Sequence, residues 1–168
     1  QYSHLNFEKS IMRNKITESN YYNMIATLLE GNYMDSRQSG YKAIIFCHTV
    51  KMCSRLKEYL EKRFNQSGLK FAKYTAEDPY DNLINSDVII TTIKSAGTAI
   101  DIPGLYVGIM TVALRSSQTN IQVLGRLRRM TDGTNPKFLW LSNSDNIKHK
   151  TYDSEKYGTI RDRVKSIG

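Results

Sequence analysis

A glutamine, a glycine and two arginines recur at helical spacing in the stretch QVLGRLRR, which covers residues 122–129. Gln122, Gly125, Arg126 and Arg129 are separated by steps of three and four residues, so a helix would place them on one face. The apolar residues between them fall on the opposite side and can pack against a sheet. Two aligned guanidinium groups are suited to neutralising the charge that builds up on a phosphoryl group during its transfer. A solvated basic face without a ligand is the alternative.

Segments of two different periodicities surround this stretch. A short, nearly continuous apolar run at residues 42–47 is expected to be a strand covered on both faces, and further strands are expected at residues 71–75, 87–93, 105–114 and 138–141. Helical spacing is found at residues 16–30, 50–64, 116–130 and 157–167. We expect Gly31 to end the first helix, residues 33–40 to form a polar loop, and a short helix after Asp78 to turn Leu83 and Ile84 inward. Because strands that alternate with helices of this length require parallel crossovers, the pattern predicts a doubly wound α/β fold, with a mainly parallel sheet and helices on both faces.

Three stretches, taken in order, resemble motifs of the C-terminal RecA-like lobe of superfamily 2 (DEAD/DEAH-type) helicases. KAIIFCHT at residues 42–49 resembles motif IV, ITTIKSAGTAIDIPG at residues 90–104 resembles motif V, and QVLGRLRR resembles motif VI. Together they cover about residues 40–145, and an ordered set is far more specific than any one motif. The spacing and the Asn-rich entry helix are most similar to phage helicases of the UvsW type, which remodel branched DNA. Ala99 departs from the pattern, since motif V commonly has glycine at this position.

The resemblance implies a role for each matching residue. Arg129 would reach the γ-phosphate of ATP as an arginine finger, and Arg126 would contact the same phosphates. Nucleotide binding is implied for Gln122, Gly125 and Asp101. Contacts with the nucleic-acid backbone are implied for His48, Thr49, Thr75, Thr92 and Lys94. In an open α/β sheet, ligands bind outside the carboxyl ends of the strands, where these loops emerge. Structural roles are also available, because threonine favours strand ends and aspartate before proline can cap a turn.

The phosphate-binding half of an ATP site has no counterpart in the sequence. No glycine is followed by Lys-Ser or Lys-Thr, so there is no Walker A loop, and no acidic DExH-like box follows an apolar strand. ATP and Mg²⁺ are therefore expected to be bound mainly by an N-terminal RecA-like lobe of the same polypeptide, and this chain alone is expected to be inactive. We expect residues 1–40 to form a helical linker segment, and residues 41–168 to form the lobe with a C-terminal helical tail.

Composition adds expectations about partners and location. The net charge of +8 and the pI near 9.5 favour a polyanionic partner, and with the resemblance we expect nucleic acid, DNA in particular. Because no run of eighteen apolar residues and no signal sequence is present, we expect no membrane association and a cytoplasmic location, in the host cell if the protein is phage-encoded. Cys47 and Cys53 are expected to be reduced thiols, and no metal site is expected.

Two other functions stay open at this point. The chain can be a binding module for nucleic acid or protein that derives from a helicase lobe and has no motor activity. It can also be a doubly wound metabolic enzyme, although no Gly-x-Gly-x-x-Gly follows a strand and no nucleophile–base pair is evident. The fold alone does not distinguish a helicase lobe from these two functions, so the assignment depends on the motifs.

Overall fold

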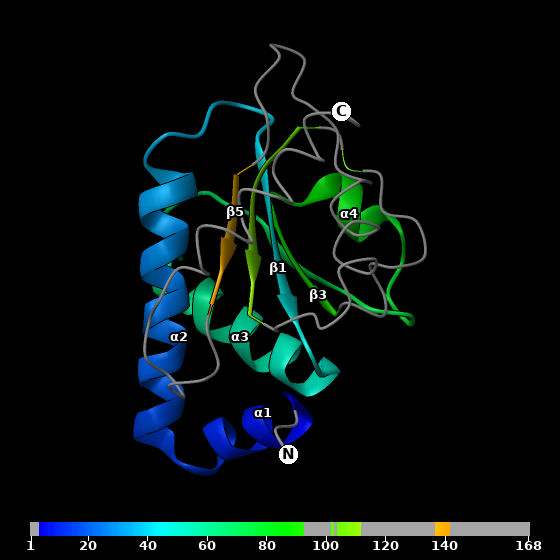
Figure 1. Cartoon of the computed structure of the whole chain (residues 1–168). Helices are drawn as coiled ribbons and strands as arrows, with labels where there is room; N and C mark the ends of the chain where they lie inside the picture. The colour runs from blue at the N-terminus through cyan, green and yellow to red at the C-terminus, as the bar shows by residue number, and fades with distance from the viewer. Residues whose placement is uncertain (1–3, 93–101, 103, 112–136, 142–168) are drawn as a thin grey trace.

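The computed structural model describes residues 4–92, 102, 104–111 and 137–141 (Figure 1). Five strands form one sheet in the order β2-β3-β1-β4-β5, and every neighbouring pair is parallel, which confirms the predicted doubly wound fold. The strands are β1 (Lys42–Cys47), β2 (Phe71–Tyr74), β3 (Val88–Thr92), β4 (Leu105–Met110) and β5 (Lys137–Trp140). The helices are α1 (His4–Arg13), α2 (Lys15–Leu29), the π-helical turn η1 (Glu30–Met34), α3 (Val50–Arg63) and α4 (Asp81–Asn85).

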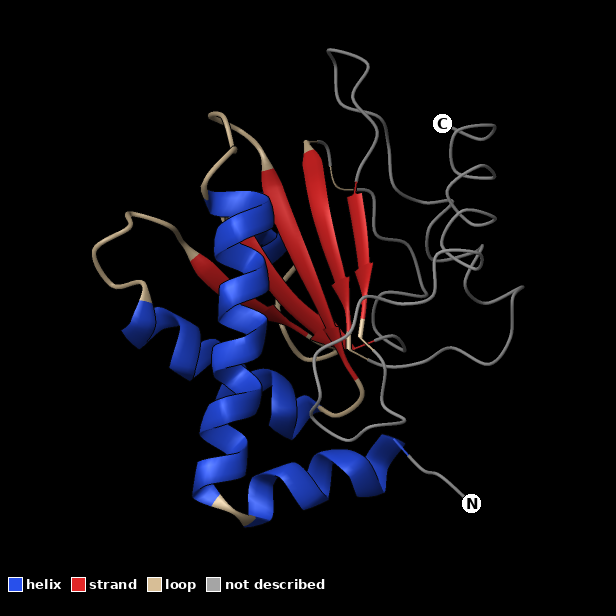
Figure 2. Ribbon diagram, turned by 60° about the vertical axis from the view of Figure 1, so that its left-hand side comes forward, coloured by secondary structure: helices blue, strands red, loops and turns tan. Residues whose placement is uncertain are grey.

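The central strand β1 is apolar on both faces because both faces are covered. Ala43, Ile45 and Cys47 join a core cluster with side chains of α1, α2 and α3, and these helices lie together on one side of the sheet in Figure 2. Ile44 and Phe46 point to the opposite face, since side chains alternate along a strand, and they are buried as well. A continuous apolar run is typical of a parallel strand in this position.

The connections place α3 and α4 on opposite faces of the sheet. From β1 the chain passes through α3 to β2, beyond β3, and then returns through α4 to β3. Because parallel crossovers are right-handed, two crossovers in opposite directions along a sheet put their helices on opposite faces. In agreement, Leu83 of α4 is buried outside the cluster that contains the α3 side chains. Helices therefore cover both faces, as predicted.

The described structure differs from the sequence expectations at three places. The helix at His4–Arg13 was expected only in general, as part of a helical linker segment at residues 1–40; its bounds were not predicted, and Phe7 and Ile11 are buried on it at helical spacing. Gly31 does not end the following helix, which continues as the π-helical turn η1 because the buried Tyr33 anchors it: its hydroxyl donates a 2.6 Å hydrogen bond to the carbonyl of Tyr41. Ile84 is 44% exposed rather than inward-facing. The helices expected at residues 116–130 and 157–167 lie outside the described residues.

None of the helices that the structure describes has the length and apolar character needed to cross a bilayer.

Gly104 fixes the start of β4, and we expect Gly104→Ala to destabilise the fold by about 2 kcal/mol. Its φ is +85°, its carbonyl accepts a 2.8 Å hydrogen bond from the Lys42 amide, and a Cβ there would lie 2.4 Å from the backbone oxygen of Gly40. Gly31→Ala is the control, because it has open space and a helical setting, and it should stabilise by about 0.5 kcal/mol. Urea unfolding measures both, and equal effects would contradict the prediction.

Candidate nucleic-acid interface

The carboxyl ends of the parallel strands meet along one edge, at the bottom of Figure 1, and α1 lies beneath it. In the sheet register, Cys47 pairs with Thr92, and Tyr74 pairs with Thr91. Three of the residues expected to contact nucleic acid thus follow or end neighbouring strands at the same level: Thr75 after β2, Thr92 at the end of β3, and His48 after β1. The sheet therefore brings together residues that are far apart in the sequence.

Thr49 begins α3 as its N-terminal cap. Its backbone is extended, and its hydroxyl accepts a 3.1 Å hydrogen bond from the amide of Met52, which is one of the unpaired amides of the first helical turn. The N-terminus of a helix carries a partial positive charge, so the loop of His48 and Thr49 presents amide groups to an anion. This is the local geometry that a phosphate contact at these residues requires.

The structure fills this position with a carboxylate of the same chain, that of Glu8 in α1. The His48 amide donates to Oε2 of Glu8 at 2.7 Å, and the Thr49 amide and hydroxyl donate to Oε1 at 2.9 and 2.6 Å. Glu8 is only 1% exposed, and burial raises its pKa although these hydrogen bonds act in the opposite direction. The sequence reasoning missed Glu8, and the signal that could have found it is the apolar spacing of Phe7 and Ile11 on the same helix.

Thr75 is held in a comparable way by a carboxylate three residues further on. Its amide and hydroxyl donate to Oδ2 of Asp78 at 2.9 and 2.8 Å, and the ammonium group of Lys73 lies 3.2 Å from the same oxygen. Burial acts to raise the pKa of Asp78, but the hydrogen bonds from Thr75 and Lys73 outweigh it and lower the pKa. The turn after β2 is therefore fixed around an ionised aspartate.

Thr92 and Thr111 complete a row of buried threonines along the edge. Thr111 follows β4, and its hydroxyl donates to the carbonyl of Phe46 at 2.6 Å. The sequence reasoning did not single out Thr111; the sheet register reveals its place, since Phe46 pairs with Met110 and Thr111 then lies level with Cys47. The Thr111 hydroxyl therefore joins β4 to β1 at this edge.

The remaining predicted site residues lie outside the described residues: Lys94, Asp101, Gln122, Gly125, Arg126 and Arg129. In the sequence, the first two stand between β3 and β4 and the other four between β4 and β5. Both connections start from the carboxyl end of a described strand. Their roles stay predictions.

Two cysteines lie at the same edge without forming a disulfide. Cys47 and Cys53 are both free thiols and both buried. A hydrogen bond with Cys53, together with burial, raises the pKa of Cys47 well above its usual range. Within the part of the chain that the structure describes, no three His, Cys, Asp or Glu side chains are grouped so that they could hold a metal ion.

Comparison with known proteins identifies the family. The model of the helicase conserved C-terminal domain matches residues 21–131, which is more than half of the chain. No curated protein matches this chain.

Solved structures show the same fold at low identity. Domain 2 of the DEAD-box helicase Mss116p, bound to an RNA duplex, is 19% identical with a TM-score of 0.57, covering 86% of this chain and 66% of that one. A fragment of a putative HsdR subunit of a type I restriction enzyme from Vibrio vulnificus YJ016 is 16% identical with a TM-score of 0.59, covering 85% and 30%. The Hef helicase domain of Pyrococcus furiosus is 14% identical with a TM-score of 0.53, covering 82% and 32%.

The chain thus spans less than two thirds of the Mss116p domain structure and about a third of the HsdR and Hef structures. The sheet matches RecA-like domains, and the family match includes the residues of all three helicase-like stretches. The chain therefore belongs to the family of helicase conserved C-terminal domains.

Proposed function

We propose that the chain is the C-terminal motor lobe of an ATP-dependent helicase or translocase that acts on DNA. The observation that carries the proposal is the family match over residues 21–131, because it spans the basic helix-like stretch at residues 122–129. The choice of DNA rests on the resemblance to phage UvsW-type helicases, whereas the Mss116p domain was solved with an RNA duplex. The net charge of +8 supports a nucleic-acid partner of either kind.

In this proposal ATP binds between this lobe and an N-terminal RecA-like lobe. Arg129 and Arg126 stabilise the charge on the transferring phosphoryl group, and Gln122, Gly125 and Asp101 contact the nucleotide. Because the sequence has no Walker A loop and no DExH-like box, Mg²⁺ is assigned to the other lobe. Opening and closing of the cleft during hydrolysis moves the lobes along the nucleic acid.

The nucleic-acid backbone is proposed to run along the carboxyl edge of the sheet, past His48, Thr49, Thr75, Thr92 and Lys94. The geometry adds a condition to this path. A hydroxyl group donates to one acceptor at a time, and those of Thr49 and Thr75 already donate to Glu8 and Asp78. A phosphate contact at either threonine therefore requires its hydroxyl to leave the carboxylate.

The test compares this chain alone with a protein that joins it to the N-terminal lobe. We expect the chain alone to bind nucleic acid with an affinity that falls steeply with salt, and to hydrolyse ATP only at the background rate. The two-lobe protein should hydrolyse ATP when nucleic acid is added. Appreciable turnover by the chain alone would contradict the two-lobe proposal. Background turnover by the two-lobe protein, with nucleic-acid binding intact, would favour the alternative of a non-catalytic binding module.

A further inference from the structure

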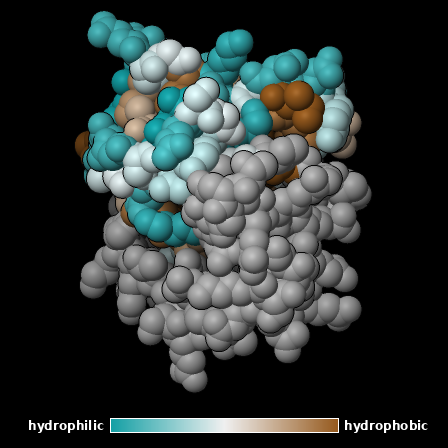
Figure 3. Space-filling model, turned by 90° about the horizontal axis from the view of Figure 1, so that it is seen from above, coloured by the Kyte–Doolittle hydropathy of each residue, from teal (hydrophilic) through white to brown (hydrophobic). Residues whose placement is uncertain are grey.

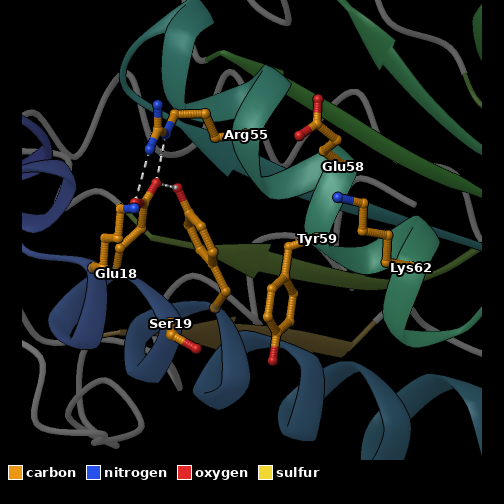
Figure 4. Close-up of a pocket in the computed structure, with 8 residues that line it drawn as sticks. Glu18, Ser19, Arg55, Glu58, Tyr59 and Lys62 are labelled. Carbon is orange, nitrogen blue, oxygen red and sulfur yellow. Dashed lines mark hydrogen bonds and ion pairs between the residues drawn. The ribbon is translucent and has the colours of Figure 1, made fainter.

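A groove of about 430 Å³ lies between α2 and α3, on the side of the lobe that faces away from the sheet. In the close-up of Figure 4, Ser19 extends from α2, and Glu58, Tyr59 and Lys62 extend from α3. Lys15, at the start of α2, also lines the groove. The groove is polar and open, so its charges decide which partner it suits.

One of its two carboxylates is already neutralised. Glu18 accepts hydrogen bonds from Nε and Nη2 of Arg55 at 2.5 and 2.8 Å, and one from the hydroxyl of Tyr22 at 2.6 Å. The hydrogen bonds from Arg55 outweigh burial and hold the pKa of Glu18 below its usual range. Besides the Glu18–Arg55 pair, the groove contains three charged groups: the ammonium groups of Lys15 and Lys62 and the carboxylate of Glu58.

The cations also form a line along α3. Lys51, Arg55 and Lys62 are spaced by four and seven residues and so share one face of the helix, on which Glu58 also lies; Arg55 is paired with Glu18. Lys51 lies close enough to Glu18 to lower the pKa of that carboxyl electrostatically. At 1.5 Å per residue this line is about 16 Å long, which corresponds to about five base pairs along the axis of a B-form duplex. It begins at Lys51, two residues after Thr49 in the first turn of α3, so it continues from the carboxyl edge of the sheet.

We propose that the α2–α3 groove binds the backbone of a nucleic-acid arm that flanks the strand held at the carboxyl edge. This inference rests on the proposed function. The unpaired ammonium groups of Lys15 and Lys62 outnumber the carboxylate of Glu58, so the groove keeps a net positive charge that suits phosphates. The hydroxyls of Ser19 and Tyr59 are donors for phosphate oxygens. Tyr59 also offers a half-buried ring beside these cations. An acidic polypeptide is the competing class of partner.

The experiment neutralises the two unpaired ammonium groups in the 168-residue chain with the double variant Lys15→Gln/Lys62→Gln. The control is Lys70→Gln/Lys137→Gln, which removes the same charge from exposed lysines at the amino ends of β2 and β5. Figure 3 views the molecule from the side of the amino ends, where the described surface is mostly hydrophilic. Binding is measured by fluorescence anisotropy, over a range of salt concentrations, with a short single-stranded DNA and with the same strand carrying a duplex arm.

We expect the groove variant to bind the DNA with the duplex arm about tenfold more weakly than the control does, and to reduce the slope of log affinity against log salt by about two. Its affinity for the short strand should stay within about twofold of the wild type, because that strand is held at the carboxyl edge. If the wild type binds both DNAs and the two double variants behave alike, the groove proposal is wrong and the proposed function stands. If the wild type binds neither DNA, the proposed function fails first. Poly-glutamate that binds the wild type as tightly as the DNA, with the same loss in the groove variant, would assign the groove to an acidic polypeptide and overturn the proposal.

Discussion

Arg129→Ala is expected to lower ATP turnover about a thousandfold in the two-lobe protein, because an arginine finger contributes in this range to phosphoryl transfer. The planar guanidinium donates two hydrogen bonds to phosphate oxygens at once, so Arg129→Lys should recover little of the loss. Nucleic-acid affinity should change little, since the proposed role is toward ATP. The measurement is steady-state ATPase activity at saturating nucleic acid.

The neighbouring Arg128 provides a matched control for this effect. It lies in the same basic stretch but off the helical face shared by Gln122, Arg126 and Arg129. Arg128→Ala should therefore leave turnover within about threefold of the wild type, as expected for a surface charge. A loss below tenfold for Arg129→Ala, or an equal loss for both variants, would return Arg129 to the class of solvated surface charges.

Glu8→Ala is expected to destabilise the chain by about 3 kcal/mol. The change removes the acceptor of three hydrogen bonds and leaves the amides of His48 and Thr49 without their carboxylate. It also opens a space where a side chain is 1% exposed. Urea unfolding measures the free energy, and Lys9→Ala on the same helix, which removes an exposed side chain, should cost less than about 0.5 kcal/mol. Equal small effects would show that α1 is only loosely attached.

The difference in free energy of unfolding between the wild type and Glu8→Ala should depend on pH, and the pKa of Glu8 gives the direction. The folded-state pKa of Glu8 is raised above its ordinary value of 4.5, so the folded chain binds the proton more tightly than the unfolded chain does. The stability that this linkage contributes is complete below pH 4.5 and is lost as the pH rises through the higher folded pKa. The difference between the wild type and Glu8→Ala should therefore shrink as the pH rises from acid to neutral. A difference that grows with pH would contradict the raised pKa.

The central part of the fold could be predicted because its signals are local. Residues 43–47 are apolar at consecutive positions, as is typical of a doubly covered strand, and the structure places β1 at Lys42–Cys47, the predicted bounds. The switch to helical spacing at Val50 likewise marks the start of α3. These elements also predicted that residues following different strands would lie together at the carboxyl edge, because parallel strands end on one side of a sheet.

What escaped prediction depends on contacts between distant residues. Glu8 accepts a hydrogen bond from the amide of His48, which is 40 positions away in the sequence. The Tyr33 hydroxyl lies 3.4 Å from the carbonyl oxygen of Asp87, which is 54 positions away. No local sequence pattern predicts either contact. Residue type was also misleading at Gly31, because helix propensity is weak compared with the burial of a tyrosine two residues later. The threonines and His48 were placed at the correct edge, but the hydrogen bond from the Thr49 hydroxyl to Glu8, 41 positions away, could not be read from spacing.

The two buried thiols at the carboxyl edge give the protein a built-in chemical reporter. A thiol reacts with alkylating reagents only as the thiolate and only where the reagent can reach it, and Cys47 meets neither condition in the folded chain. Cys53 follows the N-terminal cap of α3 by one helical turn, beneath the loop that Glu8 holds. The rate at which these sulfurs are labelled therefore reports how often α1 and the start of α3 separate. It can be measured on the protein of natural sequence, without an added probe.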